Sequence, residues 1–216
     1  MLVRSKTPDT FGRPAPLDRA IDDVRAGKPV IICDAPDREG EGDFALAAWA
    51  CTPEMIGLLL RRGSGVLCLA LPPQDADRIG ICALAHNSTD RFATRFAMPI
   101  SLNDGGSGVS FAARSATIRT AADRTNGAGR FTWPGHVSTL IAHPQGLRGR
   151  GGHTEAVIDL LRLASIDGPG VLCEILDEHG RVGEREYLCA LAGELGLSLV
   201  DIEDVKECVL SGAKVA

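Results

Sequence analysis

Short apolar runs alternate with amphipathic segments along most of the chain. Apolar side chains recur at helical spacing over residues 17–26, which predicts a short helix that ends at Gly27. The uninterrupted apolar run at residues 29–34 predicts a buried strand, with a second strand close behind it near residue 45. Further strands are predicted over residues 65–71, 96–102, 136–142, 170–176 and 197–202, and further helices over residues 52–62, 75–78, 111–122, 155–163, 184–195 and 203–210.

This order of elements favours an α/β fold with three layers, α/β/α, because strands alternate with helices. The strands near residues 30 and 45 are too close in sequence for a helical crossover, so we expect a mixed, twisted sheet. No repeat, low-complexity tract or linker divides the chain, and 216 residues favour a single domain over residues 1–216. Residues 1–16 carry three prolines and little periodicity, which predicts a loose N-terminal arm.

Composition narrows the class of protein. A hydrophobic content of 44% and a charged content of 24% are typical of a soluble globular protein. The net charge of −5 and the aromatic content of 4% argue against nucleic acid or an anionic membrane as partner. Residues 1–16 lack the apolar stretch of a signal peptide, so we expect a cytoplasmic protein. The seven cysteines contain no CxxC pair, which favours reduced, buried thiols over disulfides or a zinc site.

An acidic loop follows the predicted strand at residues 29–34. Residues 37–43 read Asp-Arg-Glu-Gly-Glu-Gly-Asp, which places four carboxylates within seven residues. Such like charges raise one another's proton affinity unless a cation or hydrogen-bond donors hold them. Gly40 and Gly42 let a ligand approach the backbone closely. The loop is therefore a candidate ligand site, and the alternative is a solvated acidic turn.

A second polar cluster opens the helix predicted near residue 155. Unpaired backbone N–H groups at a helix start favour an anion. Arg150 can bind a phosphate through two parallel hydrogen bonds, and Thr154 can add a hydroxyl. Gly151 and Gly152 leave the backbone accessible. The cluster indicates a phosphate site, and the alternative is a plain capped helix with a surface arginine.

Three further residues are candidates for metal binding or proton transfer. His153, together with one carboxylate of the acidic loop, can bind a hard cation such as Mg²⁺ or Mn²⁺. His136 precedes a predicted strand, where it can point into a cleft and act as an acid or base. The alternative is a structural histidine whose ring is hydrogen-bonded at the strand end. Glu174 interrupts an apolar strand, where it faces either solvent or a cleft, and in a cleft it would be a candidate base.

Taken in order, these motifs resemble those of the 3,4-dihydroxy-2-butanone 4-phosphate synthases of riboflavin biosynthesis. The resemblance spans nearly the whole chain. It implies a lyase, dependent on Mg²⁺ or Mn²⁺, that converts the sugar phosphate D-ribulose 5-phosphate into formate and 3,4-dihydroxy-2-butanone 4-phosphate. The steps would be enolisation, dehydration and a skeletal rearrangement. A homodimer with active sites at the subunit interface is also implied. The matching stretches are residues 37–43, 61–69, 134–137, 150–164 and 169–175.

The resemblance also implies roles for individual residues. The metal ligands would be Glu39 and His153. The catalytic residues would be His136, Glu174, Glu41 and Asp43. The substrate-binding residues would be Arg38, Glu39, Asp43, Arg150, Gly151, Gly152, His153, Thr154 and Glu174.

The chain departs from the family pattern mainly in its middle third. Ala113 and Ser101 stand where the family carries aspartate, and residues 106–108 read Gly-Ser-Gly in place of Thr-Thr-Gly. Gly40 stands in place of an asparagine. Two alternatives to the synthase reaction therefore stay open. One is a diverged paralogue that forms a different product from ribulose 5-phosphate or a related sugar phosphate, and the other is a non-catalytic homologue that binds sugar phosphate.

Overall fold

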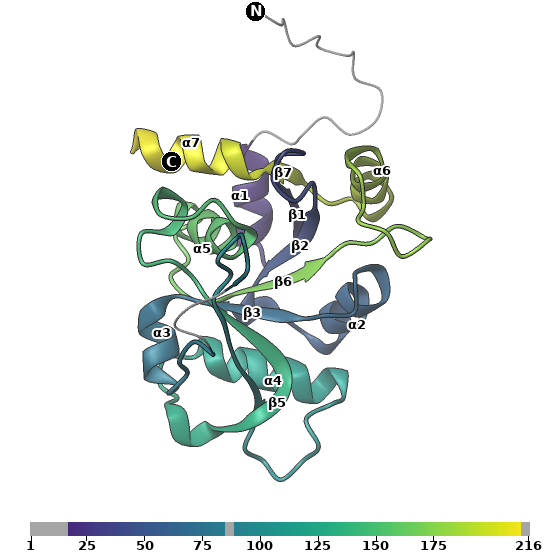
Figure 1. Cartoon of the computed structure of the whole chain (residues 1–216). Helices are drawn as coiled ribbons and strands as arrows, with labels where there is room; N and C mark the ends of the chain where they lie inside the picture. Colours follow the sequence, from purple (N-terminus) through teal and green to yellow (C-terminus); the bar gives the residue numbers. More distant parts are fainter. Residues whose placement is uncertain (1–16, 85–88, 213–216) are drawn as a thin grey trace, which may run out of the picture.

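A mixed β-sheet forms the middle layer of the protein (Figure 1). The computed structural model describes residues 17–84 and 89–212, so the expected arm at residues 1–16 lies outside the described residues. The strands are β1 (Val30–Cys33), β2 (Gly42–Ala47), β3 (Cys68–Leu71), β4 (Phe96–Leu102), β5 (Phe131–Ile141), β6 (Gly170–Glu174) and β7 (Leu199–Asp201), and in space they follow the order β4-β5-β3-β6-β2-β1-β7.

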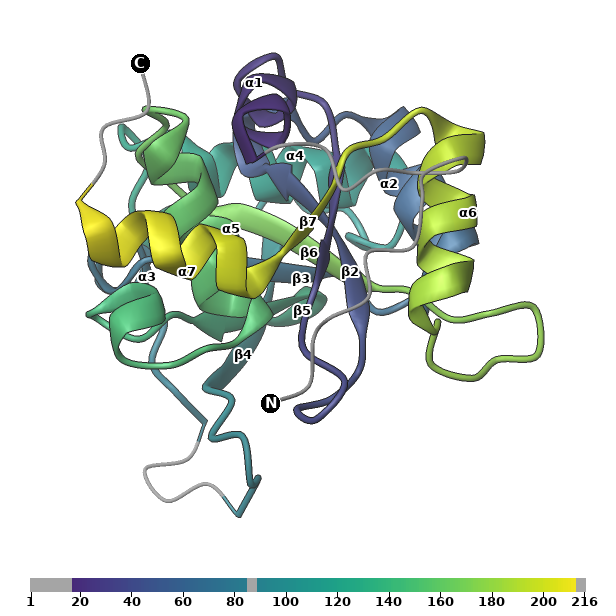
Figure 2. The ribbon, with the colours of Figure 1, turned by 90° about the horizontal axis from the view of Figure 1, so that it is seen from above.

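Helices cover both faces of this sheet (Figures 1 and 2). Side chains from α1 (Leu17–Arg25), α5 (His153–Leu163) and α7 (Ile202–Ser211) join one buried apolar cluster. The opposite cluster contains side chains from α2 (Pro53–Arg62), α3 (Pro73–Arg78), α4 (Phe111–Ala122) and α6 (Arg185–Leu195). Short 3₁₀ turns are η1 (Ala48–Ala50), η2 (Ala128–Arg130) and η3 (Gly146–Arg148). The predicted three-layer α/β/α arrangement is confirmed.

Strand pairing in the sheet is mixed, as predicted. The strand β1 pairs antiparallel with β2 and parallel with β7, and β6 lies antiparallel between β2 and β3. The strand β5 pairs parallel with β3 and antiparallel with β4. Phe44 and Leu46 of β2 pack into one cluster, while Ala45 and Ala47 pack into the other. Burial on both faces explains why the central strands read as continuous apolar runs.

Most predicted elements are present, and the largest error concerns β5. The strand begins at Phe131 and not at residue 136, so His136 lies inside it. The pairing partner Ile100 lies opposite Val137, yet the next residue, Ser101, lies opposite Thr132. Residues 133–136 therefore form a bulge, where a proline can be tolerated in a strand. Pairing with β4 draws this segment into the sheet, and local sequence carries no sign of that pairing.

The cysteines are all free, and the expectation that they are buried holds for four of the seven. Four of them, Cys33, Cys51, Cys68 and Cys173, are buried, whereas Cys82 is exposed. Among the described residues, no helix combines the length and the apolar character needed to cross a membrane.

Candidate functional site

A cavity of about 290 Å³ opens where the acidic loop between β1 and β2 meets the start of α5. The end of β6 and the segment before β4 complete its wall. Two segments more than a hundred residues apart in sequence thus face one another, as the two polar clusters suggested. The predicted site residues that line the cavity are Arg38, Glu39, Glu41, Asp43, Arg150, His153, Thr154 and Glu174.

Three predicted site residues do not line this cavity. His136 is exposed on β5, beside Ser101 of β4. Gly151 lines a neighbouring cleft between the acidic loop and α6. Gly152 lies under the Arg150 guanidinium, which a Cβ atom at this position would strike. Gly152 therefore makes room for an arginine, which is a different role from opening the backbone to a ligand.

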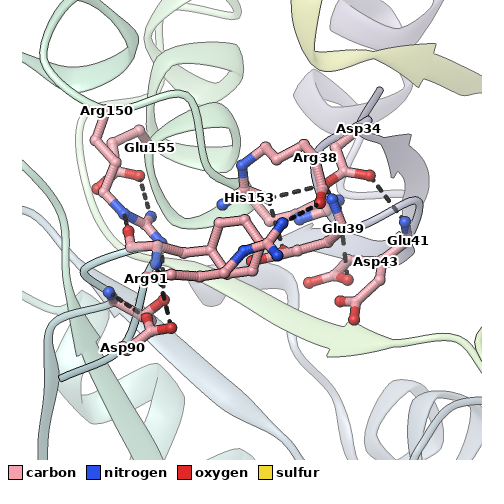
Figure 3. Close-up of polar contacts among 12 residues, drawn as sticks. Asp34, Arg38, Glu39, Glu41, Asp43, Asp90, Arg91, Arg150, His153 and Glu155 are labelled. Atoms are coloured by element: carbon pink, nitrogen blue, oxygen red, sulfur yellow. Dashed lines mark hydrogen bonds and ion pairs between the residues drawn. The ribbon is translucent and has the colours of Figure 1, made fainter. Parts of the chain in front are cut away.

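Asp34 organises the acidic loop, and sequence reasoning did not assign it a role. Its side chain is 1% exposed. One oxygen, Oδ1, accepts the backbone N–H of Glu41 at 2.8 Å, and the other, Oδ2, accepts the N–H of Glu39 at 3.2 Å (Figure 3). The same Oδ2 accepts Arg38 Nη1 at 2.8 Å. A buried carboxylate with this many donors holds the loop in one shape. The sequence signal that could have indicated this role is that Asp34 is the first carboxylate after β1.

Arg38 connects the acidic loop to the segment before β4. Its Nη1 lies 2.6 Å from Glu39 Oε2. Its guanidinium stacks on the Phe92 ring at 4.9 Å, and Arg91 contacts the same ring at 4.4 Å. Arg91 Nη2 also donates to the backbone oxygen of Arg38 at 3.1 Å (Figure 3). These contacts make Phe92 a wall of the cavity, a role that no local sequence signal indicated.

Two buried polar atoms at this site have no hydrogen-bond partner among the described residues. They are His153 Nε2 and Asp43 Oδ1, which lie 4.0 Å apart. Unpaired buried polar atoms are costly, and a cation between such groups removes the cost. Asp34, Glu39 and His153 each offer one ligand atom, and these atoms lie within 4.8 Å of one another. The residues therefore fit a hard divalent cation.

Burial shapes the protonation of these groups. It lowers the pKa of His153, which favours the neutral imidazole that a metal requires. Burial, reinforced by the charges of Asp43 and Glu39, raises the pKa of Glu41 to about 7. Burial and the nearby Glu174 raise the pKa of Asp43 well above its usual range. A cation in the cavity would offset this repulsion.

The start of α5 has the features of an anion site. Within the part of the chain that the structure describes, no side chain caps its first turn, which begins after Gly152. Arg150 Nε donates to the Phe92 oxygen at 2.8 Å, and Nη2 donates to Thr94 Oγ1 at 2.8 Å. Arg150 Nη1 donates to Glu155 Oε2 at 2.6 Å. The guanidinium is thus held rigidly beside the helix start, where its positive charge adds to that of the free backbone N–H groups.

Glu174, the last residue of β6, faces the cavity and not only solvent. Its Oε2 accepts the hydroxyl of Ser64 at 2.9 Å. The Ser64 backbone N–H donates to the Glu174 backbone oxygen at 2.7 Å. Both bonds fix the carboxylate at the cavity wall.

Comparison with known proteins places the chain in a family. The sequence model of the family described as 3,4-dihydroxy-2-butanone 4-phosphate synthase matches residues 18–208. The riboflavin biosynthesis protein RibBA of Rhodococcus jostii is 38% identical over 192 residues, which cover 88% of this chain and 46% of that protein. RibBA of Mycobacterium tuberculosis (strain CDC 1551) is 39% identical over 194 residues, with 88% and 46% covered. The chain thus spans about half the length of the curated relatives it matches.

Solved structures agree with this placement. RibBX, a two-domain 3,4-dihydroxy-2-butanone 4-phosphate synthase from A. baumannii, superposes with a TM-score of 0.85 at 32% identity, over 88% of this chain and 56% of that one. A 3,4-dihydroxy-2-butanone 4-phosphate synthase in complex with two magnesium ions also gives 0.85, at 26% identity, over 93% and 100%. The chain belongs to the 3,4-dihydroxy-2-butanone 4-phosphate synthase family.

Proposed function

We propose that this protein converts D-ribulose 5-phosphate into formate and 3,4-dihydroxy-2-butanone 4-phosphate. The observation that carries the proposal is the single cavity that joins a candidate cation site to a candidate phosphate site. A five-carbon sugar phosphate needs both, one for its phosphate and one for the oxygens near its carbonyl. No observation favours the two alternatives, a diverged product or binding alone, and Glu39, His153 and Arg150, which we assign to metal and phosphate, line one cavity.

The phosphate would bind at the start of α5. Free backbone N–H groups and the Thr154 hydroxyl supply donors, and Arg150 supplies charge. Because one N–H on each of Nη1 and Nη2 of Arg150 is already donated, only the other two remain for a phosphate. Arg150 therefore acts mainly as a fixed positive charge, with Gly151 and Gly152 shaping the turn before the helix.

Glu39 and His153 would hold Mg²⁺ or Mn²⁺, and Asp34 lies close enough to contribute. When bound, such a cation polarises a substrate carbonyl and stabilises negative charge on neighbouring oxygens. Arg38 and Asp43 would contact the sugar. Glu174 and Glu41 face the same space as candidate proton acceptors, since burial brings the pKa of Glu41 to about 7.

We infer that His136 reaches this cavity from a second subunit. It is exposed on β5 and absent from the cavity wall of its own chain. Exposed apolar side chains lie on β5 and on its partner strand β4, with Trp133 of β5 50% exposed and Phe96 of β4 46% exposed. We infer a homodimer with active sites at the interface, in which each subunit brings His136 to the other. A cytoplasmic protein without nucleic-acid or membrane partners is part of the same proposal.

Carbon NMR of uniformly ¹³C-labelled ribulose 5-phosphate tests the reaction. Labelled formate and a four-carbon phosphate should appear with Mg²⁺ and vanish with a chelator. The variant His153→Ala should lose this turnover, while His179→Ala should keep it because His179 lies on a turn away from the cavity and is 66% exposed. Substrate consumption without formate would indicate a different product, and an unchanged spectrum would overturn the catalytic proposal.

A further inference from the structure

The His136 imidazole is held by one side chain of the neighbouring strand. Ser101 Oγ accepts the backbone N–H of His136 at 3.0 Å and lies 3.3 Å from Nδ1 of its ring. Ser101 is 6% exposed, whereas His136 projects outward. A single buried hydroxyl therefore fixes both the backbone and the ring of the histidine.

The hydrogen bonds that Ser101 can make decide which ring nitrogen of His136 carries the proton. A serine hydroxyl has one proton to donate, and a buried hydroxyl proton needs an acceptor. Among the described residues, His136 Nδ1 is the one acceptor that lies in reach of this proton. A neutral ring whose Nδ1 accepts a hydrogen bond carries its own proton on Nε2.

Gly108 provides the space for this pair. Its φ of +75° belongs to the left-handed region, and a Cβ here would strike Ser101 Oγ and lie 3.0 Å from His136 Nδ1. Gly105, in the same loop, has a similar φ of +81°, but a Cβ there would meet nothing within 4 Å. The loop thus contains two glycines with the same backbone requirement, of which one touches the Ser–His pair.

We propose that Ser101 is a positioning residue that holds neutral His136 as its Nε2–H tautomer, so that the ring offers the substrate a hydrogen-bond donor. A ring in this state cannot accept a proton at Nε2. The role of His136 is then to donate to a substrate oxygen, and proton removal falls to a carboxylate, for which Glu174 is the placed candidate. This division of roles deepens the proposed function and rests on it, but the tautomer is independent of turnover.

A carboxylate in place of Ser101 would have the opposite effect. An ionised carboxylate only accepts hydrogen bonds, so it would place the ring proton on Nδ1 and leave Nε2 as an acceptor. The hydroxyl of Ser101 is consequently what makes His136 a donor in this chain.

Nitrogen NMR of the ¹⁵N-labelled full chain tests the tautomer directly. The spectrum is recorded at about pH 8.5, well above the ordinary pKa of histidine, and the His136 ring is assigned by its loss in His136→Gln. An unprotonated Nδ1 and a protonated Nε2 are expected, and Ser101→Asp should reverse them. A protonated Nδ1 in the unsubstituted chain would overturn the proposal, whether or not the protein turns over ribulose 5-phosphate. An unchanged ring in a folded Ser101→Asp protein would also overturn it.

The two loop glycines provide a second test, which can still be carried out if the Ser101→Asp variant does not fold. Gly108→Ala should lower the population of the Nε2–H tautomer and reduce kcat about tenfold, with little change in KM. Gly105→Ala carries the same backbone strain and should leave the tautomer unchanged. Ser101→Ala should act like Gly108→Ala. Equal effects of the two glycine variants on the ring signals would show that the Ser–His pair does not set the tautomer.

Discussion

Arg38 Nη1 lies 2.6 Å from Glu39 Oε2, so an internal cation occupies one face of a carboxylate that we assign to the metal. The same nitrogen lies 2.8 Å from Asp34 Oδ2, and both carboxylates belong to the candidate cation site. A metal that binds here must share Glu39 with the arginine or displace it. Phe92 offers the displaced guanidinium a second contact, because the two already stack.

We therefore predict that Arg38→Gln binds Mn²⁺ or Mg²⁺ more tightly than the unsubstituted protein does. Removing the positive charge of Arg38 lowers the repulsion between this side chain and the bound cation by about 1 kcal/mol. That difference corresponds to roughly fivefold in metal affinity. Turnover should fall at the same time, because Arg38 lines the cavity and is the residue that we propose contacts the sugar. Calorimetric titration with Mn²⁺ measures the affinity. The control is Arg91→Gln, since Arg91 stacks on the same ring and should leave the affinity unchanged. Weaker binding by Arg38→Gln would show that the arginine supports the metal site.

Metal affinity should rise with pH through neutrality. Burial raises the pKa of Glu41 to about 7, so below this pH the side chain is protonated and neutral in the metal-free protein. A nearby divalent cation favours the ionised form, and binding at pH 6 must therefore release a proton that binding at pH 8 does not. Titrations in two buffers of different ionisation enthalpy measure that release. Glu41→Gln should reduce the proton release at pH 6, and an unchanged release in this variant would assign it to another group, of which Asp43 is the nearest with a raised pKa.

The same raised pKa has a consequence for stability without metal. A carboxyl whose pKa is higher in the folded state than in the unfolded state favours folding at low pH. The contribution of Glu41 is fully present below its unfolded pKa of about 4.5 and is lost as pH rises towards 7. Added Mg²⁺ should consequently raise Tm more at pH 8 than at pH 6. A larger increase at pH 6 would contradict this expectation.

The thiols should divide into two classes of reactivity. Burial raises the pKa of Cys33 and of Cys51 to about 12, so almost no thiolate is present at pH 8. Cys82 is exposed, so a reagent can reach its sulfur in the folded protein. A disulfide reagent should therefore label Cys82 quickly, and the buried thiols should react only on unfolding. Cys82→Ser should remove the fast phase, and rapid labelling of Cys33 would indicate that the α6 side of the sheet opens.

Local signals explain which parts of this structure the sequence predicts well. The bounds of α4 agree with the predicted helix at residues 111–122, and the Ser110 side chain caps its start. The α1 bounds follow equally from apolar spacing and Gly27, whose φ is +75°. The acidic loop and the start of α5 are visible in the sequence as dense polar motifs. The resemblance to the family then indicated the roles of their residues.

The features that sequence reasoning missed depend on contacts between distant segments. Arg150 bonds to Thr94, which lies 56 positions away, and Phe92 is placed by its stacking with Arg38. The start of β5 depends on pairing with β4. Asp34 is different, because its signal was local, but its role as an acceptor of backbone N–H groups appears only when the loop is folded.

Asp34 should prove more important to the acidic loop than any of the carboxylates that follow it. The variant Asp34→Asn keeps the shape of the side chain but loses the charge that pairs with Arg38 and one of the two acceptor oxygens. We expect a loss of about 2 kcal/mol in unfolding free energy, as for other buried hydrogen bonds to charged groups. Faster hydrogen exchange at the Glu39 and Glu41 amides should accompany it.

The matched control for Asp34→Asn is Asp37→Asn, three residues further along the same loop. Asp37 is exposed, and its side chain makes no hydrogen bond among the described contacts, so the change removes one charge without loosening the loop. If loss of charge alone governed metal binding, the two variants would weaken it equally. Because Asp34 holds the Glu39 backbone in place, we expect Asp34→Asn to weaken Mn²⁺ binding at least tenfold more than Asp37→Asn. Equal affinities would mean that the loop reaches its shape without the hydrogen bonds of Asp34.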